Sequence, residues 1–166
     1  MDASVAEALW NKLADKAEAA GGGASGLAAR DTLRLEAGMP LYGHELSEEI
    51  NAASTGLNFA INRKGRTFCG DAAIAKSKEA NQDPVRVGLE LEGRRPAREG
   101  CPVLVDGTKI GTLTSGTLSP TLEKPIAMAY LSPEFSAVET KVDVDIRGKT
   151  HTATVVALPF YQRPKT

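Results

Sequence analysis

The chain has 166 residues, of which 42% are apolar and 25% are charged, and its formal net charge is −1 at pH 7. This apolar share is sufficient for a buried core, and the length fits one large domain or a small domain with part of another. The near-neutral charge argues against a basic nucleic-acid surface. No apolar run approaches the roughly 20 residues that a membrane-spanning helix needs. We therefore expect neither a nucleic acid nor a membrane as partner.

The amino terminus and the cysteines bear on the cellular compartment. The first residues lack the basic start and apolar block of a secretory signal. Cys69 and Cys101 are too few for a disulfide scaffold and show no metal-ligand spacing. We predict a cytoplasmic protein in which both thiols are reduced and buried as small apolar side chains.

The first half of the chain predicts helices separated by glycines. Apolar residues recur every four positions and predict an amphipathic helix, with Val5, Leu9, Leu13 and Ala17 on one face. Ser4 and Glu7 form a capping box at its start, and glycines 21–23 end it. Because so short a helix is rarely stable alone in water, its apolar face requires a partner surface.

The next elements are a helix, a strand and another helix. Asp31 is expected to be the N-cap of a helix over 31–37, which Gly38 terminates. The alternating apolar residues of 57–61 suggest a short strand. A further helix is expected to begin near Asp71.

From residue 85 onward the apolar pattern has the period of two that strands show. Alternation over 85–91 and 142–146 predicts two strands, and Asp106-Gly107 predicts a hairpin with a type I′ turn. We expect an antiparallel barrel or sandwich, in which closing the sheet would remove exposed edges. The predicted fold class is α+β, with an α+β domain over 1–83 and a small antiparallel β-barrel domain over 84–166.

Arg30 is the most informative charged residue, because it directly precedes the predicted 31–37 helix. A cation at a helix amino terminus is mildly unfavourable, so this guanidinium is expected to have an anionic or carbonyl-rich partner. Spacing alone favours a salt bridge to Asp31, Glu36 or another nearby carboxylate, because structural ion pairs are common. Arg34 and Glu36 point about 200° apart on the helix, and spacing favours two ordinary surface charges.

Other side chains offer no complete catalytic constellation. His44 and His151 have no serine or cysteine partner at a motif spacing, and we find neither a phosphate-binding loop nor a nucleophile elbow. Asp143 and Asp145 share one strand face and suggest a solvated exterior. No catalytic residue and no metal site is assigned.

A longer segment, GLAARDTLRLEAGMPLYGHEL, resembles a characteristic segment of glycine cleavage T-proteins over about twenty positions. The phrase GTKIGTLTSGTLSPTL is similar to the family's carboxy-terminal barrel, and LPFY resembles its closing residues. Because the resemblance runs in order along nearly the whole chain, it is far more specific than any short motif above. It identifies the sequence as similar to the carboxy-terminal portion of a T-protein, an aminomethyltransferase.

The resemblance implies a folate enzyme with three domains around a central channel. Residues 1–83 would then be the last part of an α/β folate-binding domain. The family takes the aminomethyl group from the lipoyl arm of the lipoylated H-protein, transfers the one-carbon unit to tetrahydrofolate and releases ammonia. Arg30 matches the family's folate-contacting arginine, and Tyr161 matches a position near the folate. Phe59 stands where relatives often have tryptophan and could pack on the pterin, and Arg86 matches an arginine that orients the site.

One departure from the family pattern is an absence. The catalytic aspartate and a pterin-holding glutamate of the family lie upstream of the part that this chain resembles. We therefore expect the chain to need the missing N-terminal portion of the enzyme as a partner and to be inactive alone.

Three alternatives remain open at the level of sequence. One is the folate-binding domain of a dimethylglycine or sarcosine dehydrogenase-like protein. Another is a non-catalytic binding module of the same superfamily, although KGRTFCGDA departs from the motif of such relatives at most positions. The last is a barrel that serves only as a docking surface for another chain.

Overall fold

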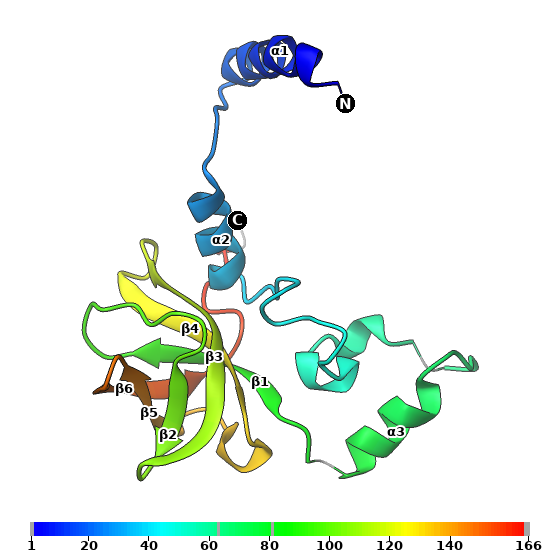
Figure 1. The fold of residues 1–166 in the computed structure, drawn as a ribbon, viewed down its shortest axis with the longest axis vertical. Coiled ribbons are helices and arrows are strands. Elements are labelled where there is room, and N and C mark those ends of the chain that lie inside the picture. The colour runs from blue at the N-terminus through cyan, green and yellow to red at the C-terminus, as the bar shows by residue number, and fades with distance from the viewer. Residues whose placement is uncertain (1, 63, 81, 165–166) are drawn as a thin grey trace. The chain divides into compact units, whose positions relative to one another are not determined.

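The computed structural model describes residues 2–62, 64–80 and 82–164. The chain divides into two compact units, Met1–Asp31 and Thr32–Thr166, and the division falls within the helix α2 (Leu27–Glu36). Figure 1 shows the elements of both units.

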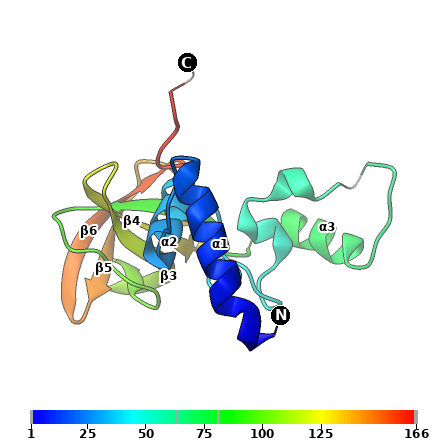
Figure 2. The same cartoon turned by 90° about the horizontal axis from the view of Figure 1, so that it is seen from above.

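The first unit contains the 3-10 turn η1 (Ala3–Val5), the helix α1 (Ala6–Ala19) and residues 27–31 of α2. Figure 2 shows α1 as one straight helix. The predicted Ser4–Glu7 capping box does not form. Instead, the Asp2 carboxylate accepts the Ser4 backbone N–H at 2.9 Å. This amide is the donor that the Glu7 side chain would bind in a capping box. Gly21 follows the helix with φ of 76°, as the predicted glycine terminus requires.

The second unit is built on a closed six-stranded antiparallel barrel, which confirms the barrel rather than the sandwich. The order around the barrel is β1-β4-β3-β2-β5-β6. The bounds are β1 Val85–Leu91, β2 Pro102–Val105, β3 Thr108–Ser119, β4 Lys124–Leu131, β5 Lys141–Ile146 and β6 Lys149–Val156. A 3-10 turn, η4 (Pro133–Phe135), follows β4. Pairing of β1 with both β4 and β6 closes the ring, so every strand has two neighbours.

The hairpin predicted at Asp106-Gly107 joins β2 to β3. Asp106 has φ of 49° and Gly107 φ of 78°, so both central residues adopt the left-handed conformation of a type I′ turn. The predicted alternation is also confirmed in β5, where Val142, Val144 and Ile146 are buried. Inward-facing aliphatic side chains of all six strands form one continuous core.

A second, smaller core lies on the outer face of the barrel. Leu35 at the end of α2 packs with Ile126 and Met128 of β4, and Leu122, Leu158 and Phe160 surround them. Gly88 of β1 makes this packing possible, because a Cβ there would lie 2.8 Å from Leu158 and 3.0 Å from Phe160. The end of α2 and the segment after β6 therefore cover one side of the barrel.

The connection from α2 to β1 contains η2 (Ala52–Thr55), η3 (Asn58–Ala60) and α3 (Asp71–Ala80). The helix predicted near Asp71 is confirmed. The strand predicted over 57–61 is wrong, because Gly56 turns the chain with φ of 75° and the Ala60 N–H donates to the Leu57 carbonyl at 2.9 Å. Three alternating apolar residues do not make a strand where no neighbouring strand offers hydrogen bonds.

The two cysteines differ in environment. Cys101 is partly buried against the barrel core, as predicted. Cys69 is exposed, which contradicts the prediction, because it lies in the turn before α3 rather than in an element that packs on a core. Among the described helices, none is long and apolar enough to cross a membrane.

Replacing Gly111 of β3 by alanine should destabilise the barrel by about 3 kcal/mol, as forced overpacking does. The added Cβ would lie 2.2 Å from the backbone oxygen of Tyr130 on β4, and a paired strand cannot move away cheaply. Gly23→Ala is the matched control, since no atom lies within 4 Å of its Cβ position. Urea unfolding followed by circular dichroism measures both. Equal stability of the two variants would show that β3 and β4 do not approach as described.

Candidate functional site

A buried polar cluster joins α2, the loop that follows it and strand β3. We call it the Glu45 cluster; its members are Arg34, Leu41, Glu45, Thr114 and Ser115. The Glu45 side chain has no exposed surface. One carboxylate oxygen accepts Nη1 of Arg34 at 2.8 Å and the Leu41 backbone N–H at 2.9 Å. The other accepts the hydroxyls of Thr114 at 2.7 Å and Ser115 at 2.5 Å.

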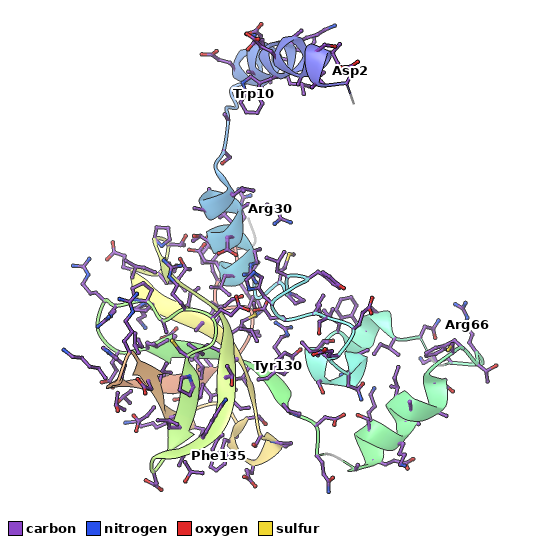
Figure 3. All side chains as sticks on the ribbon, viewed as in Figure 1. Asp2, Trp10, Arg30, Arg66, Tyr130 and Phe135 are labelled. Atoms are coloured by element: carbon purple, nitrogen blue, oxygen red, sulfur yellow. The ribbon has the colours of Figure 1, made fainter. Side chains whose placement is uncertain are left out.

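Arg34 and Tyr130 extend the connections of this cluster. Nη2 of Arg34 donates to Ser115 Oγ at 2.8 Å. The Ser115 hydroxyl therefore accepts from the guanidinium and donates to the Glu45 carboxylate. The Tyr130 hydroxyl of β4 donates to the Glu45 backbone carbonyl at 2.9 Å. Figure 3 labels Tyr130 on the barrel. The cluster thus fastens the second half of α2 and the loop around residue 45 to β3 and β4.

The surroundings of Glu45 and Tyr130 shift their pKa values in opposite directions. Burial by itself raises the pKa of Glu45, but hydrogen bonds from Ser115, Thr114 and Leu41 and the charge of Arg34 together hold this pKa below its usual 4.5. Burial raises the pKa of Tyr130 to about 12, with Arg86 opposing and Glu45 adding to the shift. At neutral pH Glu45 is therefore a carboxylate with both oxygens occupied. It holds the loop and strands in place and has no proton to offer a substrate.

Glu36, two residues after Arg34, is also buried. Its carboxylate accepts the Ser119 hydroxyl at 2.5 Å and the Thr121 hydroxyl at 3.0 Å. The prediction of two surface charges at Arg34 and Glu36 is therefore wrong. Although the two side chains point apart, polar groups of β3 and of the turn that follows it reach both sides of α2.

One sequence signal could have located these partners. Four hydroxyl residues, Thr114, Ser115, Thr117 and Ser119, lie in the second half of β3, and Ser115 and Ser119 are buried. Buried hydroxyls require hydrogen-bond partners, so this run indicates that polar groups pack against the strand. Spacing within the strand does not reveal which charged residues those groups meet.

Arg30 lies inside α2 rather than before it, which corrects the predicted helix start. The helix begins at Leu27, and the Arg30 backbone N–H already donates to the Gly26 carbonyl at 3.4 Å. The residues before Asp31 are good helix formers, and they extend the helix by a turn. Arg30 is therefore not at the helix amino terminus, and the anionic partner predicted from that position is not required. Its side chain is exposed on the first unit (Figure 3).

Arg86 of β1 connects three segments of the second unit. Its Nε donates to the Thr55 carbonyl at 2.6 Å, and Nη1 donates to the Gly38 carbonyl at 2.9 Å and lies 3.0 Å from Met128 Sδ. Burial lowers the pKa of Arg86, an effect that Tyr130 and Glu45 oppose. These contacts hold the ends of α2 and η2 against β1.

Tyr161 and Phe59 are the two aromatic residues of the predicted site. The Tyr161 backbone N–H donates to the Glu36 carbonyl at 2.9 Å, which brings the chain after β6 to the end of α2. Its side chain is 40% exposed. Phe59, in η3, is 86% exposed. Tyr161 and Arg86 thus both contact residues 36–38, whereas Phe59 lies in the separate turn that follows η2.

The histidines and carboxylates form no metal centre within residues 2–62, 64–80 and 82–164. His44 Nδ1 lies 3.0 Å from a Glu99 carboxylate oxygen and 3.2 Å from the Thr114 carbonyl. His151 buries its Nε2 atom in β6 without a hydrogen-bond partner among the described residues. Asp143 and Asp145 alternate with buried valines on the outer side of β5, as predicted.

Comparison with known families assigns this architecture to a class. The closed six-stranded barrel of the second unit has the architecture of a C-terminal barrel domain. Residues 85–162 match the glycine cleavage T-protein C-terminal barrel domain, and residues 1–65 match the GCVT N-terminal domain. The chain belongs to the glycine cleavage T-protein family.

Individual relatives agree with this assignment. An aminomethyltransferase of Cutibacterium acnes is 47% identical over 97% of this chain, and one of Corynebacterium jeikeium is 49% identical over 96%. The crystal structure of glycine cleavage system aminomethyltransferase T from Bartonella henselae covers 95% of this chain with a TM-score of 0.84 at 33% identity. The chain spans 43% of the length of each of the two curated relatives and 44% of that structure.

Replacing Glu45 by glutamine should lower the free energy of unfolding at pH 7 by about 3 kcal/mol, because it leaves the Arg34 guanidinium without its buried counter-charge. The folded-state pKa of Glu45 lies below its usual 4.5, so its contribution is present above that pH and is lost as the pH falls through the folded value. The difference between wild type and Glu45→Gln should therefore shrink as the pH falls below about 4.5.

Urea titrations at several pH values measure this difference. Glu90→Gln is the control, because its pair with Lys124 at 2.9 Å is solvent-exposed and should contribute less than about 1 kcal/mol. A Glu45→Gln penalty that matches the control, or that does not change with pH, would refute the buried ion pair.

Proposed function

We propose that this chain forms part of a folate-dependent aminomethyltransferase of the glycine cleavage system. In this proposal the enzyme transfers the one-carbon unit from the aminomethyl-lipoyl arm of the H-protein to tetrahydrofolate and releases ammonia. The observation that carries the proposal is the 47–49% identity to two aminomethyltransferases over almost the whole chain. Because the chain spans less than half of those relatives, we assign the reaction to the complete enzyme.

We propose that Arg30, Phe59 and Tyr161 contact the folate. Folate offers a carbonyl-bearing pterin and a glutamate tail, and a planar guanidinium pairs well with either. The exposed aromatic ring of Phe59 could stack on the pterin. The accessibility of Arg30 and of both aromatic side chains supports this role.

Arg86 has a different proposed role. Its guanidinium already meets two backbone carbonyls and a thioether sulfur, so we propose that it positions residues 38 and 55 rather than the folate itself. We also propose a domain boundary near residues 83–84, which the gap between the two family matches supports.

The proposed catalytic carboxylate comes from outside this chain. The buried carboxylates of Glu45 and Glu36 are occupied by protein donors and are therefore poor candidates for general acid–base work. We propose that the portion of the T-protein that this chain does not span supplies the carboxylate. We also propose that the enzyme is cytoplasmic. The lipoylated H-protein is its other proposed partner.

A binding experiment can test the folate assignment. The chain is combined with the portion of the Cutibacterium acnes relative that it does not span, and titrated with tetrahydrofolate in a calorimeter. We expect binding that weakens at least tenfold in Arg30→Ala, because a charge-assisted hydrogen bond is lost. Arg98→Ala is the control, since Arg98 is an exposed arginine of the barrel loop. No heat of binding with the wild-type chain, or equal affinity of Arg30→Ala and wild type, would contradict the assignment.

A further inference from the structure

Asp83, in the segment between α3 and β1, connects parts of the second unit that are distant in sequence. The turn η2 packs against both α3 and β1 (Figure 1). One oxygen of Asp83, Oδ2, accepts Nδ2 of Asn51 at 2.9 Å and also accepts the Ser77 hydroxyl of α3. Among residues 2–62, 64–80 and 82–164, no donor binds the other oxygen, Oδ1. The carboxylate is therefore held in place through one oxygen, and the other is available to a ligand.

Two hollows meet at Asp83. The first measures about 370 Å³ and the second about 300 Å³, and both volumes are within the range of small-molecule pockets. Ser54, Asp83 and Pro84 line both of them. The hollows are therefore adjacent, and one molecule can extend from the first into the second with its middle at Asp83.

The first hollow carries charges of both signs. Lys78 of α3 and Asp83 line it, and the other polar side chains on its walls are Ser54, Asn58 and Ser77. A ligand with only a positive charge would meet the like charge of Lys78, and a ligand with only a negative charge would meet that of Asp83. A small molecule that carries both an ammonium and a carboxylate group complements the two side chains together.

The second hollow differs from the first in its charge. Ile50, Pro84 and Tyr130 give it apolar surface, and the charged residues that line it are Glu49 and Asp83. Two carboxylates disfavour a ligand carboxylate at this position, because like charges repel. An apolar group is suited to this hollow, since its transfer from water to the apolar walls is favourable.

We propose that the two hollows form a binding site for an α-amino acid with an apolar side chain. The ligand ammonium donates to Oδ1 of Asp83, and the ligand carboxylate lies in the first hollow near Lys78. The ligand side chain lies in the second hollow against Ile50 and Pro84. The charges of the walls thus fix the orientation of the ligand. This inference does not rest on the proposed function.

A titration of the full chain with L-leucine, followed through backbone amide resonances by NMR, tests the site. We expect saturable shifts at residues that line the two hollows. Two probes each lack one charged group: 4-methylpentanoate has no ammonium, and 3-methylbutylamine has no carboxylate. The first should bind about tenfold more weakly than L-leucine, because a hydrogen bond to a charged group is lost. The second should bind about threefold more weakly, because Lys78 is exposed and its ion pair is screened.

Substitutions test the same contacts from the protein side. Lys78→Met should weaken L-leucine binding about threefold, as the probe without a carboxylate does. Lys76→Met is the matched control, because Lys76 is an exposed lysine of the same helix that lines neither hollow. Asp83→Asn should weaken binding about tenfold, and it keeps an oxygen that can accept from Asn51 and Ser77. Circular dichroism verifies the fold, and the lysine pair and the two probes decide the question if Asp83→Asn does not fold.

Several results would overturn the inference. The first is the absence of saturable L-leucine binding to the wild-type chain, and the second is 4-methylpentanoate binding as tightly as L-leucine. The third is equal affinity of Lys78→Met and Lys76→Met. We expect L-leucine binding to persist with tetrahydrofolate present, and its displacement would instead assign the hollows to the folate site. Loss of L-leucine binding when the unspanned portion of the Cutibacterium acnes relative is added would show that the complete enzyme covers them.

Discussion

The fully buried carboxylate of Glu45 is the constraint on which the second unit depends. A charge without exposed surface is tolerated only if donors surround it, and here four donors from α2, the following loop and β3 do so. Loss of any one of these donors would leave the buried charge of Glu45 poorly compensated. The geometry of the carboxylate therefore sets where the second half of α2 and its loop lie on the barrel.

Neighbouring interactions extend this arrangement across the outer face of the barrel. Glu36 receives hydroxyls from Ser119 and Thr121, and its backbone carbonyl receives the Tyr161 N–H. Arg86 holds the carbonyls of Gly38 and Thr55. Apolar packing of Leu35 on Ile126 and Met128 fills the space between these polar contacts. Directional bonds thus specify the register of the second half of α2 on the barrel, and burial of apolar surface stabilises it.

Local pattern was enough to predict the strands of an antiparallel barrel or sandwich, and the family resemblance favoured the barrel. The period of two in β1 and β5 and the Asp106-Gly107 turn depend on neighbouring residues, and the structure confirms them. Local pattern failed where the partner is distant in sequence. Arg34 meets Ser115, 81 positions away, and Glu36 meets Ser119, 83 positions away, so no helix periodicity could show that these charges are buried. The helix start was misplaced for a different reason: Asp31 is a good N-cap, but Leu27 and the alanines after it favour helix more strongly.

The folate contacts proposed for Arg30, Phe59 and Tyr161 rest on resemblance, as does the positioning role proposed for Arg86. Tyr161 and Arg86 reach the end of α2, Phe59 presents an exposed ring, and Arg30 lies on the same helix as the Glu45 cluster's Arg34. The barrel fixes the second half of α2 through the Glu45 cluster and the packing of Leu35. The catalytic group of the proposed reaction then needs to come from the rest of the enzyme.

A double-mutant cycle on Arg34 and Glu45 tests this account most directly. Unfolding free energies of wild type, Arg34→Met, Glu45→Gln and the double variant at pH 7 give the coupling energy between the two side chains. The account predicts a coupling of about 2 kcal/mol or more, in the upper range for residues in direct contact. A coupling below about 0.5 kcal/mol, as is usual for independent sites, would contradict the claim that this buried pair holds the second half of α2 to the barrel.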